Sequence, residues 1–296
     1  MKLRPAFIGT WIVSIALLFT QYGCEQPTNS NTKAPLLDSN SVSSAGTIKL
    51  DGQIISIPSP TQLAILVEQS KVPFRKELMH DLAKREKYLS EQKKALNLGV
   101  YGADLAYIAN YQQGQIANDY FDAVGKSAGE LEILDHIDGK LVSRISNNIS
   151  ERDSVLRLSA QFFQAADRYL KSNERADLAG LVLLGGWVES LHLAMDAGAV
   201  NDDVRNRIGE QKHACESLSE LLNKFTDPSM SDLQKQLNEL KAIYTNFTPK
   251  YVYGKPITDA KEKTTYFTSK STVMLSVEDL AKVKVKIEAI RQIITQ

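Results

Sequence analysis

The sequence predicts an all-α protein, either a multi-helix bundle or a solenoid-like stack of helical hairpins, with a minor β-hairpin element. The first observation is an apolar periodicity of three and four residues that begins near residue 60 and continues for about 190 residues. The second is a pair of short β-prone segments, residues 47–57 and 250–275, on either side of it. We therefore expect residues 47–296 to form one mainly helical domain.

The first element is expected to be a β-hairpin. Asp51-Gly52 stands between two β-prone runs, Thr47–Leu50 and Gln53–Ile57, and Asp-Gly favours the positive φ angles of a tight turn. A hairpin of this size is not stable alone, so it must contact other elements. One hypothesis is that residues 47–57 pair with residues 265–275.

Helices are expected to follow in succession. Pro73 is expected to begin a helix, and Ser150 with Asp153 resembles a capping box at the start of another. Ser276 with Asp279 is expected to cap the last helix. The apolar positions predict three helical pairs: residues 96–112 with 113–133, 150–172 with 174–199, and 201–225 with 228–247.

The most apolar stretch, residues 176–199, is expected to be the central helix. Gly185 and Gly186 stand inside it, where each glycine costs about 1 kcal/mol relative to alanine. A helix packed very close, or a ligand that approaches the backbone, would offset that cost. Of the two, we expect close helix packing.

The first 24 residues resemble the signal sequence of bacterial lipoprotein precursors. A short basic start precedes an apolar run from Ala6 to Thr20, which is too short for a transmembrane helix. Gly23-Cys24 follows, and a cysteine after a small residue at this place matches the lipobox of that family. The resemblance implies that residues 1–23 are a removed signal peptide and that Cys24 carries the lipid.

Two residues depart from the lipobox pattern. Gln21 stands where the family usually has leucine, and Tyr22 is bulky. An ordinary cleaved signal and an uncleaved anchor therefore remain alternatives. Residues 24–46 are rich in Asn, Ser, Thr, Pro and Gln, a composition that buries little apolar surface. We expect them to form a flexible tether between the lipid and the domain.

Charge and cysteine content exclude some classes of function. Without residues 1–23 the chain has 33 basic and 35 acidic residues, which is a net charge of −2. That argues against a nucleic-acid surface, because binding phosphates requires clustered Lys and Arg. With Cys24 acylated, Cys215 has no partner and is expected to be a buried thiol. A Cys24–Cys215 disulfide in an unlipidated protein is the alternative.

Two short motifs are similar to segments of helical lipoproteins of diderm bacteria. They are Tyr101-Gly102-Ala103-Asp104-Leu105-Ala106-Tyr107 and Gly185-Gly186-Trp187-Val188-Glu189-Ser190-Leu191. The resemblance would cover most of residues 58–295. It implies a helical ectodomain and no known activity, so it transfers no functional residue.

The same motifs indicate a candidate binding groove. Aromatic and acidic side chains concentrate in both, beside the glycine pair of the central helix. We expect the groove to be lined by Tyr101, Asp104, Tyr107, Trp187 and Glu189. Its ligand would be an envelope protein or a small molecule.

An alternative is a metal-dependent enzyme. Glu77-x-x-His80 and Glu189-x-x-His192 each place a carboxylate three residues before an imidazole, which on a helix puts both on one face. Helical bundles use paired Glu-x-x-His motifs to hold two metal ions. Glu and His at this spacing also form ordinary surface pairs, and we identify no Glu on the other helices that would complete the ligand set.

The sequence lacks the common catalytic signatures: a phosphate-binding glycine loop, His-Glu-x-x-His, Cys-x-x-Cys, Gly-x-Ser-x-Gly and an EF-hand loop. It therefore predicts no cofactor and favours a non-catalytic binding or scaffolding lipoprotein. We expect it in the bacterial cell envelope, in the outer membrane rather than the inner.

Overall fold

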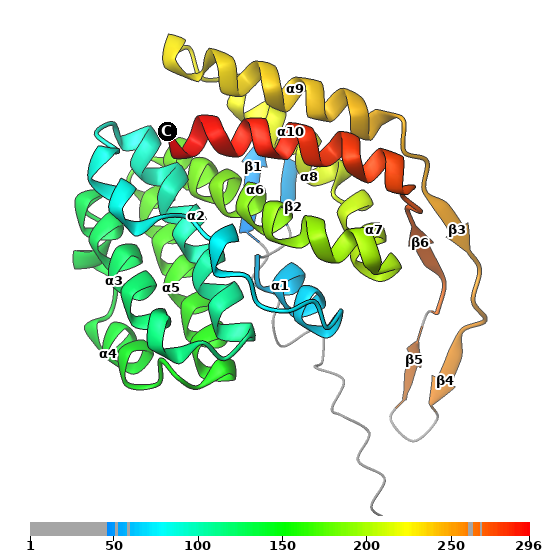
Figure 1. Cartoon of the computed structure of the whole chain (residues 1–296), viewed down its shortest axis with the longest axis horizontal. Helices are drawn as coiled ribbons and strands as arrows, with labels where there is room; N and C mark the ends of the chain where they lie inside the picture. Colours follow the sequence, from blue (N-terminus) through cyan, green and yellow to red (C-terminus); the bar gives the residue numbers. More distant parts are fainter. Residues whose placement is uncertain (1–45, 51–52, 58–59, 260–262, 267) are drawn as a thin grey trace, which may run out of the picture. The chain divides into compact units, whose positions relative to one another are not determined.

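Two helices buried along most of their length lie at the centre of the fold (Figure 1). They are α2 (Glu91–Asn110) and α6 (Ala176–Val200), which pack against each other more extensively than any other described pair. Every residue of α2 from Ala95 onward is buried. The computed structural model describes residues 46–50, 53–57, 60–259, 263–266 and 268–296, and side chains from residue 62 onward within these ranges, except at 270 and 271.

Glycines allow the backbones of α2 and α6 to touch. A Cβ atom on Gly185 would overlap the carbonyl oxygen of Leu96 in α2. A Cβ atom on Gly99 would overlap the carbonyl oxygen of Val182 in α6. The expectation that the glycines of the central helix serve close helix packing is confirmed, because no residue with a side chain fits at this crossing.

The remaining helices surround the central pair. Against α2 lie α3 (Gly114–Glu130) and α5 (Arg152–Ser172), and α4 (Gly139–Asn147) packs on α5. Against α6 lie α7 (Asp202–Gly209), α8 (Lys212–Leu222) and α10 (Val277–Thr295). The helix α1 (Pro60–Gln69) contacts both central helices, and α9 (Ser231–Thr245) lies between α8 and α10. The all-α class is confirmed. Of the three predicted helical pairs, α2 packs on α3 and α5 packs on α6, whereas residues 201–225 form two helices, α7 and α8, of which α8 packs on α9.

Three β-ribbons of two strands each accompany the helices. The first joins β1 (Gly46–Leu50) and β2 (Gln53–Ile57) with Leu50 opposite Gln53, as the Asp51-Gly52 turn predicts, although residues 51 and 52 themselves lie outside the described part. The other two pair β3 (Lys250–Val252) with β6 (Lys270–Thr272) and β4 (Ile257–Asp259) with β5 (Thr264–Tyr266). Pairing between residues 47–57 and 265–275 was a wrong prediction, because each flank forms its own antiparallel ribbon.

The helix predicted from Pro73 is also wrong. The chain between α1 and α2 instead makes two 3₁₀ turns, η1 (Lys76–Leu78) and η2 (Leu82–Lys87), with extended residues between them. We call residues 72–88 the irregular segment. Its backbone groups cannot satisfy one another as those of a helix do, so they need partners from other elements.

The N-terminus of α5 differs from its prediction. The capping box predicted at Ser150 does not form, because α5 begins one residue later, with Glu151 as an N-cap that makes no side-chain bond. The helix α6 is long and apolar enough to cross a membrane by composition, but 94% of its most apolar window is buried within the fold, as in a core helix.

Cys215 is a buried free thiol whose pKa is raised by burial.

Several N-terminal predictions lie outside the described residues. These are the signal peptide over residues 1–23, the lipid site at Cys24 and most of the tether over residues 24–46.

Candidate functional site

The predicted groove residues do not line a groove open to solvent. Tyr101, Asp104, Tyr107, Trp187 and Glu189 are all buried, and Asp104 and Glu189 have no exposed surface. The indole N–H of Trp187 donates to Oε1 of Gln211 at 3.1 Å. Helices α2 and α6 are covered on all sides by other elements, so these residues face the interior of the fold.

One face of α2 holds the irregular segment in place. Three polar side chains of α2, together with Tyr111 directly after it, lie at helical spacing and bond the backbone of this segment. Asp104 Oδ2 accepts from the N–H of His80 at 3.0 Å, and the Tyr107 hydroxyl accepts from the N–H of Arg75 at 3.1 Å. The Tyr111 hydroxyl donates to the carbonyl of Val72 at 2.6 Å, and that of Tyr101 to Asp81 at 3.5 Å. From α3, the Tyr120 hydroxyl donates to the carbonyl of His80 at 2.7 Å.

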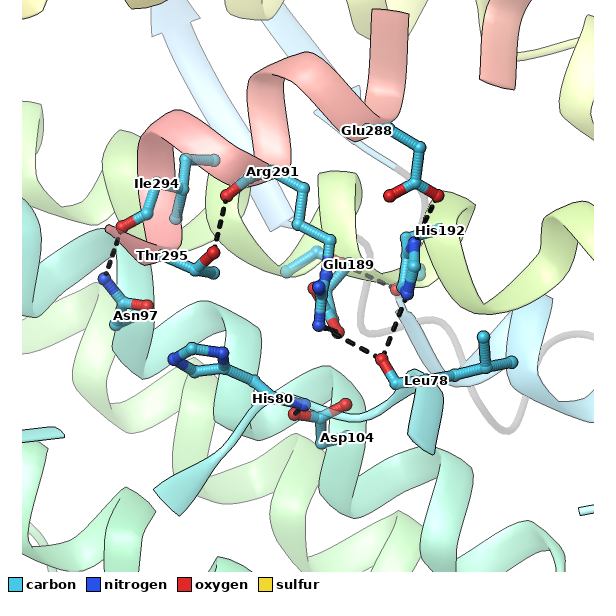
Figure 2. Close-up of polar contacts among 12 residues, drawn as sticks. Leu78, His80, Asn97, Asp104, Glu189, His192, Glu288, Arg291, Ile294 and Thr295 are labelled. Atoms are coloured by element: carbon cyan, nitrogen blue, oxygen red, sulfur yellow. Dashed lines mark hydrogen bonds and ion pairs between the residues drawn. The ribbon is translucent and has the colours of Figure 1, made fainter. Parts of the chain in front are cut away.

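The carbonyl of Leu78 is the meeting point of three elements (Figure 2). It accepts a bond of 3.0 Å from Nε2 of His192 on α6 and a bond of 3.1 Å from Nη2 of Arg291 on α10. Both donors come from helices that approach the irregular segment from the side opposite α2. The segment is therefore held between α2 and the α6–α10 pair.

A buried ion pair joins α6 to α10. The guanidinium of Arg291 donates through Nε to Oε2 of Glu189 at 2.6 Å and through Nη2 to Oε1 at 2.8 Å (Figure 2). Such a bidentate pair satisfies both carboxylate oxygens at once. Removing either partner would leave a buried charge without compensation.

The carboxyl group of Asp104 is buried near this pair. Its Oδ2 accepts from the N–H of His80, and its Oδ1 is buried and has no hydrogen-bond partner among the described residues. Burial, and then the charge of Glu189, raise the pKa of Asp104 well above its usual value. Asp104, Glu189 and Arg291 form the centre of what we call the polar cluster.

His80 is a neutral histidine in this interior. The hydroxyl of Tyr88 lies 2.6 Å from Nε2 of His80 and donates to the carbonyl of Thr295 at 3.1 Å. Because the hydroxyl has one proton, it accepts from Nε2, and the ring is the Nε2–H tautomer. Burial, and next the positive charge of Arg291, lower the pKa of His80 to about 3.

His192 lies at the edge of the same cluster. Nδ1 lies 2.7 Å from a carboxylate oxygen of Glu288, and Nε2 lies 3.0 Å from the Leu78 carbonyl (Figure 2). The hydrogen bond from His192 is the largest cause that lowers the pKa of Glu288.

The final turn of α10 is fixed to the irregular segment and α2. Nδ2 of Asn97 donates to the carbonyl of Ile294 at 2.9 Å, and Lys93 Nζ donates to that of Ile293. With Tyr88 on Thr295, three carbonyls at the end of this helix have partners. Polar contacts, as well as its apolar face, therefore hold α10 against the irregular segment and α2.

The geometry does not assemble the predicted metal ligands. Glu77 and His80 lie on the irregular segment rather than on a helix, and the Glu77 side chain is 65% exposed and paired with Arg75. The two imidazoles have different partners: His80 contacts the Tyr88 hydroxyl, and His192 contacts Glu288 and the Leu78 carbonyl (Figure 2). Both oxygens of Glu189 are bound by Arg291, and the described residues contain no group of three His, Cys, Asp or Glu placed to hold a metal ion.

Several members of the cluster were missed by the sequence analysis. They are Tyr88, Tyr120, Glu288 and Arg291. Arg291 had a usable signal, since it stands on the apolar face of α10 between Ile287 and Ile294, where a charge requires a buried partner. Tyr88, on the irregular segment, had no periodic pattern from which its role could be predicted.

Exposed apolar side chains gather elsewhere. Ten large apolar residues are exposed in the described part of the chain, and seven of them lie between residues 251 and 277. They are Tyr251, Val252, Tyr253, Ile257, Tyr266, Met274 and Val277. Most belong to the paired strands β3 to β6, which we call the C-terminal ribbon, residues 250–272 (Figure 1).

Comparison with known proteins found no counterpart. No protein-family model matches the chain, and neither a curated protein nor a solved structure matches it significantly.

Proposed function

We propose that this chain is a lipid-anchored protein of the bacterial cell envelope that acts as a non-catalytic binding or scaffolding module. Cys24 carries the anchor, and the outer membrane is the proposed location. The helical body presents the C-terminal ribbon as its contact surface. The support for the anchor is the signal-like start followed by Gly23-Cys24.

The polar cluster supports a structural rather than a catalytic role for the interior. Its acidic and basic groups bond one another or the backbone of the irregular segment. A catalytic group needs room for a reacting atom beside it. Asp104 and Glu189, the most perturbed acid and its neighbour, have no exposed surface.

The observation that carries the proposal is the concentration of exposed apolar side chains on the C-terminal ribbon. Singly scattered apolar residues on a surface are ordinary, but their concentration in one region marks a site of interaction. A two-stranded ribbon is also marginal by itself, so contact with another surface would stabilise it.

Two measurements test the proposal. The intact mass of the mature protein, purified from its native membrane, should show residues 24–296 with acyl groups on Cys24. A shortened-ribbon variant, which joins Gly254 to Thr268, should keep the fold and lose the contacts that crosslinking detects for the wild type. An unacylated Cys24, or unchanged contacts in the shortened variant, would contradict the proposal.

A further inference from the structure

The C-terminal ribbon has no face packed on the helical body where β3 runs. Tyr251 and Val252 are neighbours in this strand, so their side chains point to opposite faces. Tyr251 is 64% exposed and Val252 is 52% exposed. On the outer part, Ile257 stands directly opposite Tyr266, so the two lie on one face, and both are exposed.

The ribbon is also positively charged. Residues 250–272 contain five lysines and two acidic residues, whereas the whole chain has equal numbers of basic and acidic residues. Lys250, Lys255 and Lys263 are exposed. The ribbon therefore combines exposed tyrosines and aliphatic side chains with a local excess of cations.

This combination suits one kind of surface. Tyrosine favours the interface between water and lipid headgroups, where its ring is apolar and its hydroxyl remains hydrated. Each lysine near an anionic membrane surface adds favourable electrostatic energy. We propose that the C-terminal ribbon binds the headgroup region of an anionic phospholipid membrane, which rests on the proposed function and specifies what the ribbon contacts.

A second copy of the chain fits the ribbon less well. Two ribbons paired edge to edge would bring their lysines together, and like charges opposed across a sheet are destabilising. An anionic partner removes that repulsion. Charge complementarity therefore favours the lipid surface over self-association.

The proposed anchor places the ribbon within reach of such a surface. Gly46, the first described residue, follows Cys24 by 22 positions. A chain of this length spans at most about 80 Å when fully extended. An acylated Cys24 would therefore confine the domain near the bilayer, where even weak lipid contacts by the ribbon become effective.

A vesicle experiment tests the lipid contact without the anchor. Residues 24–296 with Cys24→Ser lack both the signal-like segment and the acylation site, so their sedimentation with vesicles reports the surface of the remaining protein alone. The protein should bind vesicles of phosphatidylcholine with about 30 mol% phosphatidylglycerol and dissociate from them at high salt. It should not bind vesicles of pure phosphatidylcholine. Changing Lys250, Lys255 and Lys263 to Gln should weaken binding on the order of 100-fold.

A matched control separates the ribbon from general charge attraction. Lys87, Lys126 and Lys140 are exposed on the helical body, and changing these three to Gln should leave vesicle binding nearly unchanged. Equal loss in the two triple variants would overturn the proposal. So would the absence of binding to anionic vesicles, or self-association that depends on the ribbon and occurs without lipid.

A fluorescent reporter tests contact directly. Tyr253→Trp places an indole on the ribbon, and Leu89→Trp places one at an exposed position of the body. Brominated lipids in anionic vesicles should quench the fluorescence of the indole at position 253 and leave that of the indole at position 89 unchanged. The buried Trp187 contributes a constant background. If the fluorescence of neither indole is quenched, the ribbon does not contact the bilayer. Acylation of Cys24 is read separately by mass, so failure of the anchor and failure of the ribbon contact are distinguishable.

Discussion

Glu189 and Arg291 are 102 residues apart in the sequence and form a bidentate ion pair of 2.6 and 2.8 Å in the interior. The pair joins the central helix α6 to the last helix α10. Nη2 of Arg291 also bonds the Leu78 carbonyl, so one guanidinium connects both helices with the irregular segment. The ion pair therefore links distant elements of the fold. Glu189, which the sequence suggests as a ligand-binding residue, has both carboxylate oxygens bound by Arg291.

Removal of the guanidinium should be severely destabilising. Arg291→Met keeps the length of the side chain and leaves Glu189 buried without a partner. We expect a loss of about 3–5 kcal/mol in the free energy of unfolding, measured by urea denaturation with the fluorescence of Trp187. Lys282→Met, which breaks the exposed pair with Asp279, is the control and should have little effect. A comparably small effect of both variants would show that the buried pair is not a structural link.

Asp104→Asn should alter the pH dependence of stability. The raised pKa of Asp104 means that folding takes up a proton above the normal aspartate pKa, so its contribution to stability falls as pH rises. Asparagine can still accept from the N–H of His80, and it does not titrate. Between pH 5 and pH 8 the variant should gain on the wild type by up to about 1.4 kcal/mol per pH unit. Parallel stability curves would mean that Asp104 is ionised in the folded protein.

His80 should destabilise the fold in acid. Its pKa is about 3 in the folded state against 6.5 in a free histidine, so the unfolded state gains the proton first as pH falls. Its contribution to stability is complete above pH 6.5 and is lost toward pH 3, by about 1.4 kcal/mol per pH unit. His80→Gln, which can still donate to Tyr88, should lack this loss. A ¹⁵N spectrum of His80 that becomes imidazolium near pH 6 would refute the assignment.

The contact of α2 with α6 should be intolerant of a single methyl group. Gly185→Ala would place its Cβ against the Leu96 carbonyl, and we expect a loss of about 3 kcal/mol or more in stability. Gly125→Ala in α3 is the matched control, because a Cβ there meets no atom within 4 Å, and it should be neutral or stabilise by about 1 kcal/mol. Equal melting temperatures for the two variants would argue against a close crossing.

Local patterns predicted much of the fold. The pairing of β1 with β2, the role of the glycines of α6 and the cap at Ser276 all depend on a few neighbouring residues, so they were predictable. The irregular segment was not predicted, because its conformation depends on hydrogen bonds from Tyr107, Asp104 and other distant side chains. Leu78 and Leu82 stand at helical spacing and so predict a helix. The hydrogen bonds that these distant side chains make to the backbone favour the irregular conformation instead.

The site illustrates the same limit. The sequence places polar and aromatic residues close together in the two motifs and suggests a groove, whereas the structure buries these side chains in the interior. The four side chains from Tyr101 to Tyr111 bond the irregular segment, a role that periodicity cannot distinguish from ligand binding. Arg291 completes the cluster from the far end of the chain, and sequence spacing gives no measure of that convergence.

A photocrosslinking scan in the native envelope tests most directly whether the C-terminal ribbon is the working surface. A photoreactive residue is placed in turn at three ribbon positions, Tyr251, Tyr253 and Ile257, and at three body positions, Leu89, Val200 and Val285. All six are at least 61% exposed, so they differ in location rather than in access to solvent. We expect phospholipid adducts from the ribbon positions and few from the body. Adducts of equal yield from both sets, or from the body alone, would contradict this account.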